Sequence, residues 1–114
     1  MKSRTKYLGI IALTLLTLAI ASRQPSFAAD NPPVAIKIDN FSFSPQTITV
    51  PAGTQITWTN QDDIPHTVVS DDKTTFKSRA LDTDEKFSFT FTKPGSYTYF
   101  CSIHPKMTAK VIVE

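Results

Sequence analysis

The sequence predicts an all-β protein built as a sandwich of two sheets, and three observations support this fold class. Beyond residue 33, apolar and polar residues alternate in short steps of period two, which is the pattern of half-buried strands. Groups of Pro, Gly, Asn and Asp separate these steps, and no window carries the apolar stripe of an amphipathic helix. Each strand therefore offers one apolar face, and two sheets can bury such faces against each other.

Seven strands follow from this pattern in chain order. They are expected over residues 34–38, 46–50, 55–59, 67–70, 86–92, 96–101 and 108–113. Their apolar faces carry Ile56 and Trp58; Phe87, Phe89 and Phe91; and Tyr97, Tyr99 and Cys101. Residues 74–84 have weaker periodicity and are expected to form a loop with a short turn of helix.

The first 28 residues are predicted to be a secretory signal peptide. Basic residues precede an uncharged apolar run over 7–21, and the small residues Ser26 and Ala28 suit a cleavage site after position 28. An earlier cut near residue 21 and an uncleaved membrane anchor are the alternatives, although the run is shorter than the roughly 20 residues that span a bilayer. We therefore expect residues 29–114 to form one domain that is periplasmic or otherwise exported, with no stable membrane anchor.

The charge of this domain excludes some classes of function. Removal of residues 1–28 leaves 86 residues with 8 basic and 10 acidic side chains. The net charge is then about −2, and a nucleic-acid partner is not expected because no basic stripe is present. A single domain of this size favours a binding or carrier module over a large enzyme.

One short loop concentrates the residues that carry chemistry. Cys101, His104 and Met107 follow one another at even three-residue steps between the last two predicted strands, and the one other histidine is His66. Soft sulfur combined with imidazole suits copper, and two histidines, one cysteine and a weak axial methionine form the blue-copper arrangement. The sequence therefore predicts a site for one copper ion that alternates between Cu(I) and Cu(II).

Each of these ligands has a structural alternative when it is taken alone. Methionine often fills a core, a single histidine often lies on the surface, and the lone Cys101 of an exported chain can be buried, reactive or paired with another molecule. Their occurrence together at this spacing favours the metal site. Pro65 and Pro105 stiffen the backbone beside both imidazoles, which suits a site that relaxes little between two copper states.

At these residues the chain resembles the cupredoxin family, and the Cys-x-x-His-x-x-Met loop is similar to that of amicyanins and plastocyanins. Residues 56–68 resemble the family segment that delivers the first histidine, and residues 93–101 resemble the strand that delivers the cysteine. The resemblance implies an eight-stranded Greek-key sandwich with a type 1 copper at one end, and electron shuttling between redox proteins.

The resemblance also implies a role for each ligand. His66, Cys101 and His104 would be the strong, nearly coplanar ligands, and Met107 the weak axial one. An electron donor and acceptor would dock transiently where the His104 ring edge emerges through an apolar patch. That patch is expected to contain Ile64, Pro65, Ile103 and Pro105.

Three further residues near the predicted copper site have expected roles of their own. Family members usually carry Asn after the first histidine, and here Thr67 is expected to supply a similar hydrogen bond to the loop around Ser102. Lys106 places a positive charge in the ligand loop, which favours an acidic partner or a higher potential unless it is simply solvated. Phe100 is either a second docking point or a packing residue.

The favoured function is a monomeric one-electron carrier rather than an enzyme. Copper enzymes with blue-copper domains need further histidines for a second centre, and a thiol nucleophile with a histidine base leaves Met107 unexplained. The main alternative is an exported copper-binding or copper-delivery protein that does not cycle electrons.

Overall fold

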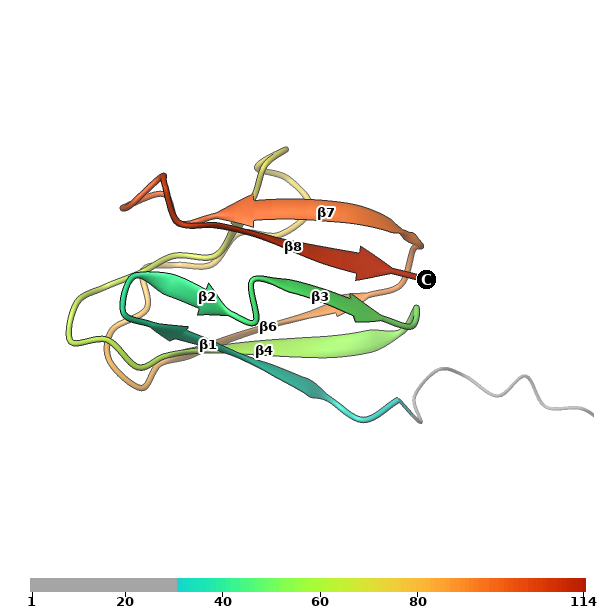
Figure 1. The fold of residues 1–114 in the computed structure, drawn as a ribbon, viewed down its shortest axis with the longest axis horizontal. Helices are drawn as coiled ribbons and strands as arrows, with labels where there is room; N and C mark the ends of the chain where they lie inside the picture. The colour runs from blue at the N-terminus through green and yellow to red at the C-terminus, as the bar shows by residue number, and fades with distance from the viewer. Residues whose placement is uncertain (1–30) are drawn as a thin grey trace, which may run out of the picture.

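The computed structural model describes residues 31–114, which form two layers of strands (Figure 1). The strands are β1 (Val34–Asp39), β2 (Ser42–Ser44), β3 (Thr47–Val50), β4 (Thr54–Asn60), β5 (Val69–Ser70), β6 (Lys86–Phe91), β7 (Gly95–Phe100) and β8 (Thr108–Val113). The predicted signal peptide, residues 1–28, lies outside the described residues. Within the described part of the chain, no helix is long and apolar enough to cross a membrane.

Two four-stranded sheets make the layers, and the all-β sandwich prediction is confirmed. One sheet has the order β2-β1-β4-β6 and the other the order β3-β8-β7-β5. The pairs β1–β4 and β3–β8 are parallel, and the remaining pairs are antiparallel. Because β4, β5, β6 and β7 alternate between the sheets, each of the three connections from β4 to β7 crosses an end of the sandwich, whereas β7 and β8 are neighbours in one sheet. Such crossings bring residues from both sheets to one rim.

The predicted strands agree with the structure to within one residue at most ends. The predicted strand 67–70 is shorter than expected, since β5 covers only Val69–Ser70 and His66 makes an isolated bridge to Leu81. Strand β2 was not among the seven predicted strands. It has three residues, so it is too short to show a period of two.

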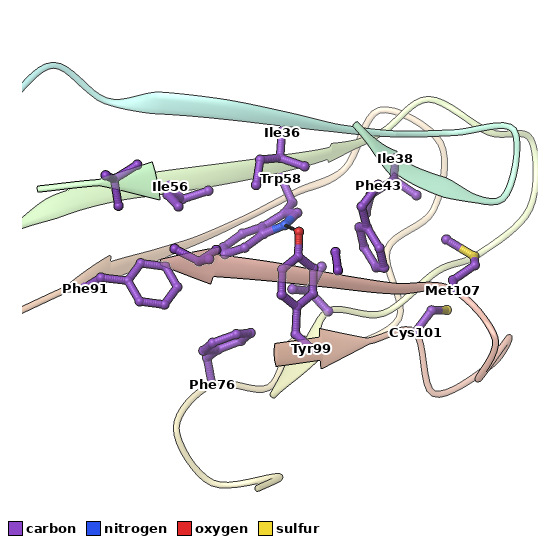
Figure 2. Close-up of a cluster of buried hydrophobic side chains, with 14 of the residues drawn as sticks. Ile36, Ile38, Phe43, Ile56, Trp58, Phe76, Phe91, Tyr99, Cys101 and Met107 are labelled. Atoms are coloured by element: carbon purple, nitrogen blue, oxygen red, sulfur yellow. Dashed lines mark hydrogen bonds between the residues drawn. The ribbon is translucent and has the colours of Figure 1, made fainter. Parts of the chain in front are cut away.

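The core is aromatic and confirms the predicted apolar faces (Figure 2). Trp58 and Tyr99 are fully buried, and the Trp58 indole Nε1–H donates a hydrogen bond of 3.1 Å to the Tyr99 hydroxyl. Desolvation by burial raises the pKa of Tyr99 to about 12, although this bond opposes the rise. Cys101 and Met107 lie at one end of the same cluster, so the loop predicted to carry the metal ligands begins and ends in the core.

Residues between β5 and β6 form the expected loop, but the short turn of helix expected within it is not formed over residues 71–85. The loop is tied to the sandwich by backbone bridges of Leu81 to His66 and of Lys77 to Val69. Phe76 from this loop is buried and its ring lies 5.8 Å from that of Trp58, so the loop closes one side of the core.

Phe76→Ala should lower the free energy of unfolding by about 3–5 kcal/mol, because it removes a buried ring and leaves a cavity against Trp58. Denaturant unfolding followed by tryptophan fluorescence measures the loss. Phe89→Ala is the matched control, since Phe89 packs against the Phe76 ring itself but is only half-buried. An equal loss in both variants would contradict the role of Phe76.

A carboxylate organises the start of this loop. Asp72 accepts hydrogen bonds from the Ser70 hydroxyl, the Thr75 hydroxyl, and the backbone N–H groups of Thr74 and Thr75. The hydrogen bond from Ser70, followed by those from Thr75 and Thr74, holds the pKa of Asp72 well below its ordinary value. Because the folded state lowers this pKa, the ionised Asp72 stabilises the fold at pH values above about 4, and the effect fades as the pH falls further.

Asp72→Asn should therefore lower the free energy of unfolding at pH 7. The gap in this free energy between the variant and the native chain should narrow as the pH falls below about 4. Unfolding at a series of pH values measures the gap. Asp63→Asn removes an exposed carboxylate and serves as the control. A gap that is constant from pH 7 to pH 3 would rule out this linkage.

Candidate metal centre

The predicted site residues meet at one end of the sandwich. The β1–β2 hairpin, the connection that follows β4 and the β7–β8 connection all reach the end opposite the C-terminus (Figure 1). Cys101 directly follows β7, whereas His66 follows β4 of the other sheet. The site is therefore assembled from both layers of the fold.

Two imidazoles face one buried sulfur. The Nδ1 atom of His66 lies 3.7 Å from the Cys101 Sγ, and the Nδ1 atom of His104 lies 3.8 Å from it. The ligating atoms of these three residues all lie within 4.8 Å of one another. Cys101 and His66 are fully buried, while His104 is partly exposed. The arrangement thus has a closed inner side and one imidazole that reaches solvent.

Met107 closes the loop on the same side. Its backbone N–H donates to the His104 carbonyl at 2.9 Å, and its carbonyl accepts a bond of 3.0 Å from the Cys101 N–H. These two bonds fold residues 101–107 into a compact turn. Met107 is buried and lies beside Cys101 in the core cluster (Figure 2). Its thioether is therefore on the same side of the site as the Cys101 sulfur.

Asn60 at the end of β4 anchors the segment that carries His66. Its side-chain amide donates to the carbonyls of Ile64 and Leu81, each at 2.8 Å, and its Oδ1 accepts from the Asp62 N–H at 2.9 Å. Leu81 in turn exchanges two backbone hydrogen bonds with His66. The buried amide therefore fixes the turn before His66 and the loop beside it.

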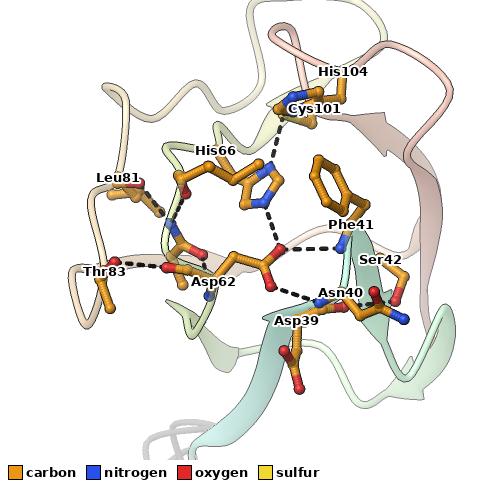
Figure 3. A network of polar contacts seen from close by, with 12 residues as sticks. Asp39, Asn40, Phe41, Ser42, Asp62, His66, Leu81, Thr83, Cys101 and His104 are labelled. Atoms are coloured by element: carbon orange, nitrogen blue, oxygen red, sulfur yellow. Dashed lines mark hydrogen bonds and ion pairs between the residues drawn. The ribbon is translucent and has the colours of Figure 1, made fainter.

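Asp62 orients the His66 ring. The Nε2 atom of His66 lies 2.7 Å from the Asp62 Oδ2, which leaves Nδ1 free to face the sulfur (Figure 3). Partial burial alone would raise the pKa of Asp62, but hydrogen bonds from Phe41, His66 and Asn40 outweigh it and hold the pKa below its ordinary value. A carboxylate on the far nitrogen of a ligating histidine fixes its tautomer and raises its basicity.

The donor set fits a single copper ion. First-row metals such as zinc lie about 2.0–2.1 Å from imidazole nitrogen and about 2.3 Å from thiolate sulfur, so nitrogen and sulfur bound to one ion are at most about 4.4 Å apart. Both nitrogen-to-sulfur distances are shorter than this limit. Two imidazoles with a thiolate and a nearby thioether form a soft set that suits copper.

Comparison with known proteins agrees with this chemistry. Residues 10–113 match the family described as cupredoxin-like domain. The chain belongs to the cupredoxin family. Its relatives include the amicyanin of Paracoccus versutus, which is 34% identical over 105 residues, covering 85% of this chain and 78% of that protein. The plastocyanin of Tetradesmus obliquus is 36% identical over 84 residues, covering 63% of this chain and 58% of that protein.

Solved structures confirm the cupredoxin fold. The amicyanin structure from Paracoccus versutus matches with a TM-score of 0.67 at 35% identity, covering 76% of this chain and 88% of that one. A copper-containing nitrite reductase from Thermus scotoductus matches with a TM-score of 0.69 at 32% identity. That match covers 75% of this chain but only 23% of the reductase chain. Family and donor set together confirm the prediction of a copper cofactor.

In this cupredoxin, Thr67 makes the hydrogen bonds that the sequence predicts. Its hydroxyl lies 2.7 Å from the Ser102 hydroxyl and accepts a bond of 2.7 Å from the Ser102 N–H. Its own backbone N–H donates to the Cys101 Sγ at 3.4 Å. One threonine therefore ties the two ligand-bearing segments together and also contacts the sulfur.

Thr67→Val should cost about 0.5–1.5 kcal/mol of unfolding free energy, because the loop loses the hydroxyl that serves Ser102 while the side-chain shape is kept. Thr67→Ser keeps the hydroxyl and should cost less. Thermal and denaturant unfolding of both variants test this link between the loops. Equal stability of the valine variant and the native chain would show that the link is unimportant.

Two residues of the site were not predicted from the sequence. Asp62 stands four positions before His66, and a carboxylate at that spacing is a usable signal for a histidine partner. The Phe41 ring contacts both histidine rings, but it comes from the β1–β2 turn, and no sequence pattern connects it to them. Of the predicted apolar patch, Ile103 and Pro105 line a groove beside His104, whereas the half-buried Ile64 and the exposed Pro65 do not.

Proposed function

We propose that this protein is an exported one-electron carrier that holds one copper ion through His66, Cys101, His104 and Met107. The observation that supports it best is the convergence of two imidazole Nδ1 atoms on one fully buried thiol. His66, Cys101 and His104 would be the strong ligands and Met107 the weak axial one. Residues 1–28 would direct export to the periplasm or an equivalent space and then be removed.

The chain would supply a rigid binding site for this ion from which water is largely excluded. Copper bound there contributes a one-electron exchange between Cu(I) and Cu(II). Asp62 and Thr67 fix the two ligand segments, and the core excludes water from the Cys101 side. Because the ligands are held by hydrogen bonds from both sheets, they have little freedom to rearrange when the charge of the ion changes.

Redox partners would dock transiently at the partly exposed His104. An open groove of about 490 Å³ lies beside this histidine. It is lined by Phe41, Ile103, His104, Pro105, Lys106 and Met107. Phe41 and Ile103 are 52% and 46% exposed, and large apolar side chains so exposed mark an interaction surface. Small, brief contacts of this kind suit a monomeric carrier.

A catalytic role is less well supported. The described residues hold one cluster of metal-ligating side chains, and the chain has no histidine for a second copper centre. Cys101 is 0% exposed, whereas a nucleophilic thiol needs access to its substrate. Copper delivery without electron cycling uses the same ligands, so experiment has to separate it from electron transfer.

Addition of Cu(II) to the purified protein should produce an intense thiolate-to-copper charge-transfer band in the visible spectrum. Cys101→Ser should abolish the colour, and Met107→Gln should keep the copper but lower the reduction potential. Absence of the band in the native chain, or its persistence in the serine variant, would sink the ligand assignment. Fast reversible voltammetry supports a carrier, whereas irreversible or very slow cycling favours delivery.

A further inference from the structure

The turn between β1 and β2 has an unusual backbone. Asn40 and Phe41 form its two-residue loop, and both have positive φ, 50° and 56° respectively. Two-residue hairpin loops of this kind strongly favour glycine at the second position, because a bulky side chain there is strained. Phenylalanine is therefore strained at this position. Its ring is also 52% exposed, so burial of the ring does not offset the whole of this strain.

One carboxylate holds this strained turn. Asp62 Oδ1 accepts the Asn40 N–H at 2.7 Å, and Oδ2 accepts the Phe41 N–H at 3.0 Å (Figure 3). The same Oδ2 lies 2.7 Å from the Nε2 of His66. A single side chain thus connects the backbone of the hairpin to an imidazole of the metal centre.

The turn places an aromatic ring against both imidazoles. The Phe41 ring centroid lies 5.7 Å from that of His66 and 5.1 Å from that of His104, with interplanar angles of 87° and 88°. Such edge-to-face contacts lie within the favourable range for aromatic pairs. The ring also lines the groove at His104, so it contacts the buried site on one side and the docking surface on the other.

We propose that Asp62 and Phe41 act as one positioning device, in which the Asp62 carboxylate locks the His66 ring and the Phe41 turn in a fixed relation. The carboxylate holds the turn in its strained form, and the turn presents the ring that limits rotation of both imidazoles. Backbone strain retained beside a functional site supports such a role. We call the hydrogen bonds of Asp62 to the Asn40 and Phe41 N–H groups and to His66 the clamp. The clamp is a property of the chain without metal, whereas its effect on copper rests on the proposed function.

The clamp is tested by amide hydrogen exchange. In Asp62→Asn the side-chain NH₂ cannot accept a hydrogen bond, so at least one of the bonds to Asn40, Phe41 and His66 is lost. At least one of the Asn40 and Phe41 amides should then exchange about tenfold faster or more, both in the metal-free and in the Cu(I)-loaded protein. Asp63→Asn removes the same charge next to Asp62 and should leave these amides unchanged. Equal exchange in the two variants would overturn the clamp.

The coupling is tested with copper bound. Asp62→Asn should lower Cu(II) affinity by about 10- to 100-fold and raise the reduction potential, because His66 loses the carboxylate that increases its basicity. Asp63→Asn should have a much smaller effect on both. Phe41→Leu should change the visible and EPR spectra of the copper while leaving the fold intact, since Phe41 is half exposed.

A double-mutant cycle decides whether the two residues act together. If Asp62 positions Phe41, the spectral change caused by Phe41→Leu should be largely lost in the Asp62→Asn background. Additive changes would overturn the proposal. A native protein that develops no charge-transfer band would instead refute the copper assignment, and the exchange experiment on the metal-free chain would still report on the clamp.

Discussion

The meeting of one buried sulfur with two imidazoles is the constraint on which the functional end of this protein depends. Cys101 leaves the core at the end of β7, while His66 arrives from β4 of the opposite sheet. Buried polar groups of this kind are costly unless each has a partner. Asn60, Asp62 and Thr67 supply those partners, and no side-chain nitrogen or oxygen buried among residues 31–114 lacks a hydrogen bond. Polar contacts at this rim therefore do the positioning that apolar packing does in the core.

Features that depend on residues close together in the sequence could be predicted from it. The alternation of β4 and β6 determines which residues face the core, and the spacing of Cys101, His104 and Met107 marks the ligand loop because one turn contains all three. His66 could be assigned although it is 35 residues from Cys101, since the chain has only two histidines. Its geometry, however, follows from crossings between sheets, which local periodicity does not describe.

Apart from the local contact of Asp62 with His66, the features that escaped prediction depend on long-range contacts or on very short elements. Asp62 bonds to Phe41 across 21 residues of sequence, and neither residue type nor spacing indicates that pairing. Strand β2 has three residues, and Phe76 stands between polar residues of its loop, so neither produces a periodic signal. Both are defined by packing against residues that are distant in sequence: β2 contacts β8 of the other sheet, and Phe76 packs on Trp58.

If the proposed function is right, the residues around His104 combine a cost in stability with access for redox partners. A fold selected for stability alone would bury Phe41 and Ile103 and would place glycine in the strained hairpin loop. This chain instead exposes both apolar side chains beside the one imidazole that reaches solvent, while His66 and Cys101 stay fully buried. Electrons would then enter and leave through His104 without access of water to the sulfur. Because Phe41 contacts both imidazoles, its ring connects the groove at His104 with the buried His66.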